Sequence, residues 1–197
     1  VGRGLLEHDG VGVLRAVATA VIIVAAAVLW HRLPTPDDVY GPFDVRAGVG
    51  QAVSGRAITA RVDGVRIAPR IRKDRETSPV LDAVGIWIVI DGEAMTTRTD
   101  QNLSSELIVG PNTYKFTGRL DFMPLAGSLT PGISVHSSWV FDVPADLVAA
   151  GAQTITLRLW VGDGRMDSRL VIDMPLDDPR VDRTDFVRLA PTVQVGT

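Results

Sequence analysis

The residues that most often carry enzyme chemistry are few and scattered along this chain of 197 residues. The three histidines, His8, His31 and His136, lie in separate segments, and a long apolar run separates the first two. Ser137 directly follows His136, so in an extended segment the two side chains would point to opposite faces and could not act together. Cysteine is absent, which removes thiol nucleophiles, thiolate metal ligands and disulfides. The sequence therefore predicts neither a catalytic triad nor a zinc site.

Glycine-rich and acidic segments give equally weak signals for cofactor or metal binding. GVGQAVSG, residues 48–55, lacks the lysine and the following helix that a phosphate-binding loop requires. The pairs Asp163/Asp167 and Asp177/Asp178 offer the oxygen ligands that Ca²⁺ prefers, but their spacing matches no known calcium loop. Aspartate is also common in turns, where it bonds to the local backbone. We expect no metal, no cofactor and no enzymatic activity.

The most distinctive charged segment is RVDGVRIAPRIRKDRE, residues 61–76. Its candidate contact residues are Arg66, Arg70, Arg72, Lys73 and Arg75. These cations could meet anionic lipid headgroups or an acidic partner. Alternatively, they are the solvated charges that keep an edge strand from aggregating, which is the interpretation that we favour. The net charge of −3 gives no cationic signature for nucleic acid.

A long apolar segment lies near the N-terminus. Residues 16–30 carry no charge, and the apolar run extends back through Arg15 to Val11. Residues 11–30 thus approach the length of about 20 residues that a membrane-spanning helix requires. Arg15 and Trp30 would lie at the two membrane interfaces, where a long cationic chain and an amphipathic aromatic ring are favoured. The segment predicts a membrane anchor.

Flanking charges and a run of alanines are compatible with either a retained anchor or a cleaved signal peptide. Arg3 and Arg15 precede most of the apolar run and only Arg32 directly follows it, which favours an N-terminus inside and a C-terminal domain outside. Ala25-Ala26-Ala27 offers a signal-peptide cleavage site, although these alanines lie within the apolar run. We favour the retained anchor; cleavage would release a secreted protein.

Beyond residue 42 the hydrophobic pattern changes to the two-residue alternation typical of strands. Alternating segments occur at 58–67, 84–91, 106–109, 113–116, 139–143, 155–161 and 170–174. Residues 84–91, VGIWIVID, are apolar on both faces, which predicts a central strand covered on both sides. Only PADLVAAG, residues 144–151, has the Pro-start and Gly-end pattern of a short helix. We expect Trp87 and Trp139 to fill the space between two sheets.

These observations predict a mainly β fold: an antiparallel, immunoglobulin-like β-sandwich preceded by one N-terminal transmembrane helix. The expected organisation is a short cytoplasmic N-terminus at 1–10, an anchor helix at 11–30, a proline-rich linker at 31–42, an extracytoplasmic sandwich at 43–175 and a surface tail at 176–197.

One stretch, LTPGISVHSSWVFDVPADL at 129–147, resembles the signature of the telokin-like, immunoglobulin-fold extracytoplasmic domains of bacterial lipoproteins and single-pass membrane proteins. The similar elements are the Pro131-Gly132 turn and the Phe-Asp-Val-Pro pattern at 141–144. The lipid-bearing cysteine of the lipoprotein members is missing, so the helix would be the anchor. The resemblance implies a fold and an extracytoplasmic location, not an activity.

The function that we expect is that of a binding or accessory module, held in the cell membrane by residues 11–30, that docks onto another envelope protein or a membrane complex. The partners would be membrane lipid around the helix and an envelope protein whose identity the sequence does not give. The alternatives are a secreted sandwich released by cleavage and, with less support, an envelope enzyme.

Overall fold

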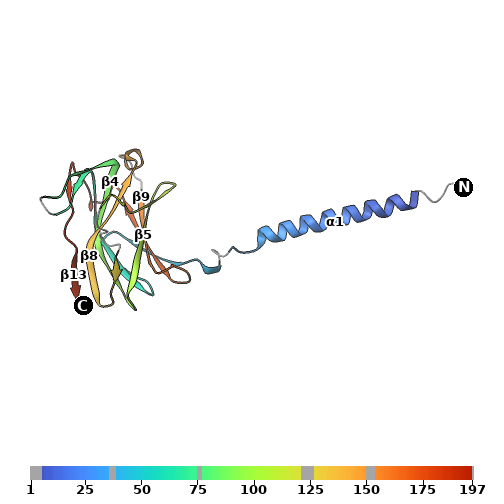
Figure 1. Ribbon diagram of the computed structural model, residues 1–197, viewed down its shortest axis with the longest axis horizontal. Helices are drawn as coiled ribbons and strands as arrows, with labels where there is room; N and C mark the ends of the chain where they lie inside the picture. The colour runs from blue at the N-terminus through green and yellow to red at the C-terminus, as the bar shows by residue number, and fades with distance from the viewer. Residues whose placement is uncertain (1–5, 36–38, 75–76, 121–126, 150–153, 197) are drawn as a thin grey trace. The chain divides into compact units, whose positions relative to one another are not determined.

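The computed structural model describes residues 6–35, 39–74, 77–120, 127–149 and 154–196. The chain divides into two compact units, residues 1–40 and 41–197, and each is described by itself (Figure 1). The first unit contains one long helix and the second contains the strands.

Helix α1 spans Leu6–Arg32. An apolar run rich in alanine and valine forms it, and it ends just before Leu33, the residue preceding Pro34, whose ring disfavours the helical conformation there. Thr19 is the polar residue inside the apolar stretch, and its hydroxyl donates a 2.9 Å hydrogen bond to the Arg15 carbonyl. The helix therefore satisfies its own polar groups along the apolar stretch.

The second unit is a sandwich of two sheets. The first sheet has the order β1-β10-β9-β5-β6, with β7 also paired to β5. These strands are β1 Phe43–Gly48, β5 Gln101–Val109, β6 Asn112–Lys115, β7 Ser128–Leu129, β9 Thr154–Val161 and β10 Ser168–Pro175. All its ladders are antiparallel except β1 with β10, which is parallel.

The second sheet has the order β11-β3-β4-β8-β13, with β2 and β12 also paired to β3. These strands are β2 Ala52–Ser54, β3 Ile58–Arg72, β4 Leu81–Thr96, β8 Ile133–Val143, β11 Val181–Arg183, β12 Val187–Arg188 and β13 Val193–Gly196. β11 and β12 run parallel to β3. A single turn of 3₁₀ helix, η1 Ala145–Val148, follows β8, as the sequence predicted for this position.

The main core lies between the two sheets and is built from the inward-facing residues of both. Trp139 and Phe141 of β8 are its largest side chains, and Leu107, Leu157 and Ile172 meet them from the first sheet. The predicted mainly β sandwich, preceded by one apolar helix, is confirmed.

The prediction for Trp87 was wrong. Trp87 is fully buried, but it lies in a second cluster on the outer face of the second sheet, with Val89 and Val140. It misses the inter-sheet space because side chains alternate along β4, so Ile86 and Ile88 take the inward positions.

The C-terminal segment covers this outer cluster. We call residues 176–196 the strap, because they supply the strands at both edges of this sheet: β11 pairs with β3 and β13 pairs with β8 (Figure 1). Between β11 and β13 along the strap, Val187 and Leu189 pack in the same cluster as Trp87. The segment that the sequence analysis set apart as a tail thus contributes β11, β12 and β13 to the second sheet. Its buried side chains explain why β4 is apolar on both faces.

Candidate functional site

The cations of segment 61–76 do not form one surface. Arg66 donates to both carboxylate oxygens of Asp91, at 2.6 and 2.7 Å, and its third nitrogen donates to the Arg188 carbonyl of the strap at 3.0 Å. Ser138 donates to the same Asp91 carboxylate at 2.7 Å. All three nitrogens of Arg66 therefore form bonds on the outer face of the second sheet, where they tie the strap to β3 and β4.

The remaining cations have different surroundings. The guanidinium carbon of Arg72 lies 5.8 Å from the centre of the Phe186 ring, a cation–π contact with the strap. Arg70 is exposed, and Lys73 is half-buried. Arg75 lies outside the described residues. β3 is not the edge strand that the sequence analysis considered, because β4 flanks one side and β2, β11 and β12 flank the other.

Next to Arg70, strand β4 carries a large bulge. Between the pairs Ala68–Trp87 and Arg70–Asp82, β3 advances by two residues while β4 advances by five. The extra residues disrupt the ladder, and Val84 at their centre is 87% exposed. No other large apolar side chain among the described residues is as exposed.

The Asp142 carboxylate clamps this bulge. It accepts hydrogen bonds from the backbone N–H groups of Val84 and Gly85, at 2.9 and 3.0 Å. Arg119 donates to the same carboxylate at 2.9 Å and to the Asp82 carbonyl at 2.7 Å. The Arg119 guanidinium also lies 5.1 Å from the Trp87 ring. A Cβ at position 85 would lie 2.1 Å from the Val143 carbonyl oxygen, so only glycine fits there.

The clamped bulge (Ala83–Ile86, with Asp142 and Arg119) is the candidate site for contact with a partner. It presents one apolar side chain on a backbone fixed by a charged hydrogen-bond network, with a cation at Arg70 nearby. Such pre-organisation lowers the ordering cost of binding. Sequence reasoning missed the bulge, although the Phe-Asp-Val-Pro pattern contained its signal: Asp142 is an acidic residue within the apolar run at 139–143.

The histidine of β8 is part of an ionic cluster with a different geometry from a catalytic triad. His136 Nε2 and Ser134 Oγ each lie 3.0 Å from the same oxygen of Glu93, and Arg61 lies 3.3 Å from the other oxygen. In a nucleophilic triad the imidazole stands between the hydroxyl and the acid, whereas here the carboxylate stands between them. This arrangement stabilises charges across β3, β4 and β8.

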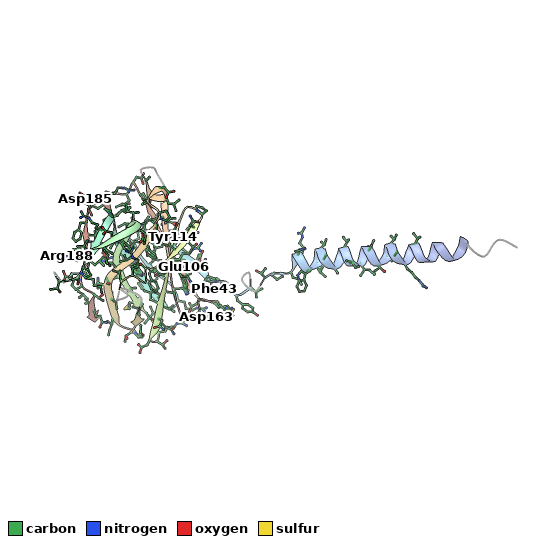
Figure 2. All side chains as sticks on the ribbon, turned by 45° about the horizontal axis from the view of Figure 1, so that its top comes forward. Phe43, Glu106, Tyr114, Asp163, Asp185 and Arg188 are labelled. Atoms are coloured by element: carbon green, nitrogen blue, oxygen red, sulfur yellow. The ribbon has the colours of Figure 1, made fainter. Side chains whose placement is uncertain are left out.

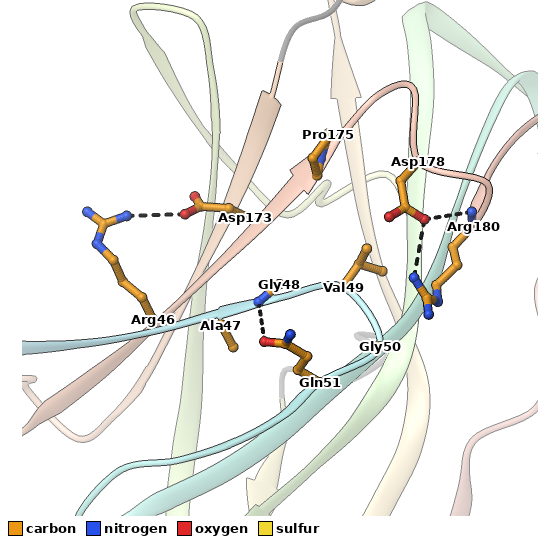
Figure 3. Close-up of a pocket in the computed structure, with 10 residues that line it drawn as sticks. All are labelled: Arg46, Ala47, Gly48, Val49, Gly50, Gln51, Asp173, Pro175, Asp178 and Arg180. Carbon is orange, nitrogen blue, oxygen red and sulfur yellow. Dashed lines mark hydrogen bonds and ion pairs between the residues drawn. The ribbon is translucent and has the colours of Figure 1, made fainter.

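A groove of about 570 Å³ lies where β1 ends and the strap begins (Figure 3). Its cations are already paired: Arg46 with Asp173 at 3.3 Å and Arg180 with Asp178 at 3.4 Å. The ten residues drawn include neither a hydroxyl nor an imidazole. The groove is therefore polar, and each of its two carboxylates is held by an arginine.

Most of the aspartates considered above as calcium ligands accept hydrogen bonds from backbone N–H groups in their own turns. Asp163 and Asp167 accept backbone hydrogen bonds from Arg165 and Ser168, at 3.0 and 2.7 Å. Asp178 accepts from Arg180. Among the described residues, no group of three or more histidine or acidic side chains is placed to hold a metal ion.

The predicted interface residues Arg15 and Trp30 both lie on α1 with exposed side chains, and Trp30 is 75% exposed. Residues 12–32 of this helix are long and apolar enough to cross a membrane, with a mean hydropathy of 2.4. Length and composition of this kind fit either an anchor or a signal sequence.

Comparisons with known proteins do not identify a family for this chain. No protein-family model matches the chain, and no curated protein matches it in sequence. One similar solved structure is an uncharacterized beta-sandwich protein from Clostridium difficile 630, with 14% identity and a TM-score of 0.46 over 72% of this chain and 99% of that chain. The two sheets and the helix of the chain itself define it as a β-sandwich protein with one N-terminal apolar helix.

Proposed function

We propose that this protein is a single-pass membrane protein whose sandwich is displayed outside the cytoplasm, where it docks onto another envelope protein or membrane complex. The observation that carries the proposal is the division of the chain into an apolar helix and a separate sandwich with its own core. The described side chains of residues 12–32 are exposed all round the helix and most of them are apolar, which suits a lipid environment. In this proposal, α1 stays in the bilayer, and the sandwich is of the telokin-like class.

The proposed docking site is the clamped bulge. Val84 would enter an apolar pocket of the partner, and Arg70 beside it would meet an acidic group at the rim of the interface. Because the anchor confines both proteins to one membrane, an interface of modest affinity would suffice. In this proposal the protein has a binding role and no enzymatic activity of its own.

The anchor is tested by the mass and the membrane retention of the mature protein. A retained α1 leaves the full-length mass and keeps the protein in the membrane pellet after carbonate washing. Cleavage after Ala27 would give a chain that begins at Val28 and washes into the soluble fraction. That result would contradict the anchor and indicate a secreted protein. A cysteine at Thr35 should react with an impermeant thiol reagent in intact cells, whereas one at Gly4 should not.

Docking is tested by a photo-crosslinking amino acid at position 84 of the full-length protein in its native membrane. We expect one discrete adduct from position 84 and none from position 80, since Val80 is also exposed, at 46%, but lies outside the bulge. In the protein without the crosslinker, Val84→Asp should reduce co-purification of the partner found in that adduct by about tenfold or more, because it would bury an unpaired charge. Equal adducts from both positions would contradict docking through the bulge.

A further inference from the structure

We propose a second contact surface at the other end of the sandwich: the attachment rim, formed by Phe43, Arg56, Arg98, Arg165 and Met166, which rests on the surface of the lipid bilayer. This inference rests on α1 being retained in the membrane. It concerns a different surface from the clamped bulge and a different partner, the phospholipid headgroup layer.

The rim is one connected structure. The Phe43 N–H donates to the Asp167 carbonyl at 2.9 Å, and Arg56 donates to the Met166 carbonyl at 3.2 Å. The Arg56 N–H also bonds to the Ser168 hydroxyl at 2.7 Å, and Thr97 donates to the Arg56 carbonyl at 3.0 Å. Three loops and the first residue of β1 are therefore fixed together.

Two large apolar side chains project from this rim. Phe43 is 62% exposed and Met166 is 53% exposed. Met166 also has a φ of +50°, which is unusual for a residue other than glycine and requires support from its surroundings. The hydrogen bond from Arg56 to its carbonyl supplies part of that support. An exposed aromatic ring and a thioether on fixed backbone suit insertion between headgroups.

Arginines surround the apolar pair. Arg56, Arg98 and Arg165 are exposed, and a hollow of about 330 Å³ lies beside Arg98 and Arg165. The guanidinium group matches phosphate geometry. The acidic residues in these loops are Asp100, Asp163 and Asp167. Because the charges nearly balance, Phe43 and Met166 would provide most of the binding and the arginines would orient the rim on phosphates.

The covalent chain determines which end of the sandwich stays near the bilayer. β1 begins at Phe43, and residues 33–42 can span at most about 35 Å between it and the end of α1. Figure 2 shows Phe43 and Asp163 at one end of the sandwich and Asp185 and Arg188 at the other. Strand β3 runs about 45 Å from the rim end to Arg72. The tether therefore keeps the rim end within about 35 Å of the end of α1, whereas the far end of the sandwich, with the bulge, can lie beyond that reach and meet a protein partner.

The test uses the full chain in vesicles of phosphatidylcholine with phosphatidylglycerol. Because the chain has no cysteine, Met166→Cys, Thr97→Cys and Asp185→Cys each give one site for a polarity-sensitive fluorophore. We expect the probes at 166 and 97 to be quenched by a shallow lipid-borne spin label at least about twofold more than the probe at 185. Phe43→Ser combined with Met166→Ser should lower the quenching of the probe at 97 to that of the probe at 185. The control pair, Val80→Ser with Val193→Ser, should leave the quenching at 97 unchanged.

Equal, water-like signals at 166 and 185 in reconstituted protein would overturn the inference and leave the proposed anchor intact. Failure of the full chain to insert into vesicles would count against the anchor, and with it against this inference. Quenching of the probe at 97 that survives the double substitution would also overturn it, because the apolar pair would then not be the contact.

Discussion

At the scale of single residues, Asp142 illustrates how one buried carboxylate can define a surface. It accepts two backbone hydrogen bonds from the bulge and one from Arg119, and its side chain is only 15% exposed. Without it, two N–H groups and a guanidinium would lose their acceptor. Unpaired groups of this kind are costly because water cannot fully replace the lost bonds.

We therefore expect Asp142→Ala to lower the free energy of unfolding by about 2–3 kcal/mol. Urea unfolding followed by tryptophan fluorescence measures this change. Asp82→Ala is the matched control: its carboxylate is exposed and only its backbone carbonyl joins the network, so the loss should stay within about 0.5 kcal/mol. Equal losses for the two variants would contradict the clamp.

The pair Asp44–Arg169 links β1 to β10 and makes stability depend on pH. The hydrogen bonds from Arg169, at 2.7 and 3.1 Å, hold the pKa of Asp44 below its usual value. Because the pKa in the folded state is the lower one, the pair stabilises the fold above the unfolded pKa, about 3.9. That stability is lost as the pH falls from there through the folded pKa.

Arg169→Gln should therefore raise the pKa of Asp44, as measured by NMR titration of its carboxyl carbon. At neutral pH the free energy of unfolding should fall by no more than about 1 kcal/mol, since both side chains are partly solvated. Below both pKa values the two proteins should be equally stable. An unchanged Asp44 titration would contradict the pairing.

At the scale of elements, the strap is the part that completes the second sheet. It covers Trp87 with Val187 and Leu189, pairs with β3 and β8, and is held by Arg66 through the Arg188 carbonyl. An uncovered strand with Trp87 and Val89 on its outer face would be prone to aggregation. The strap is thus part of the fold and not an appendage.

Leu189→Ala should cost about 2–4 kcal/mol, because Leu189 is 1% exposed and the substitution leaves a cavity over Trp87. Val193→Ala in the same strap should cost less than about 0.5 kcal/mol, because Val193 is 49% exposed. Equilibrium unfolding of the two variants measures the difference. A small loss for Leu189→Ala would mean that the strap contributes little to stability.

At the scale of the whole molecule, the helix and the sandwich have separate tasks. The buried core lies between residues 49 and 189, entirely within the second unit. We expect residues 41–197 alone to be soluble, monomeric at low concentration and cooperatively folded, with the same urea midpoint as the full chain in detergent. Aggregation, or a clearly lower midpoint, would show that the helix contributes to the fold.

Much of the architecture follows from local patterns in the sequence. The apolar run at 11–30 and the two-residue alternation of the later segments predict one helix and a β-sandwich, because both patterns depend on nearby residues alone. The two apolar faces of 84–91 likewise predict a central strand with a cover on each side. The membrane location stays a prediction.

Only the tertiary structure determined which segment covers the outer face, where β4 bulges and which acid Arg66 meets. Each depends on a contact between residues far apart in sequence, such as Asp142 with Val84 or Arg66 with Arg188. Periodicity says that a side chain is buried but not on which face of the sheet, which is why Trp87 was assigned to the wrong side. The cations of 61–76 appear as one cluster in the sequence, yet Arg66 bonds to Asp91 and the strap, Arg72 lies against Phe186 and Arg70 is exposed. Their surroundings differ because the strap and the bulge of β4 give each position along β3 different neighbours.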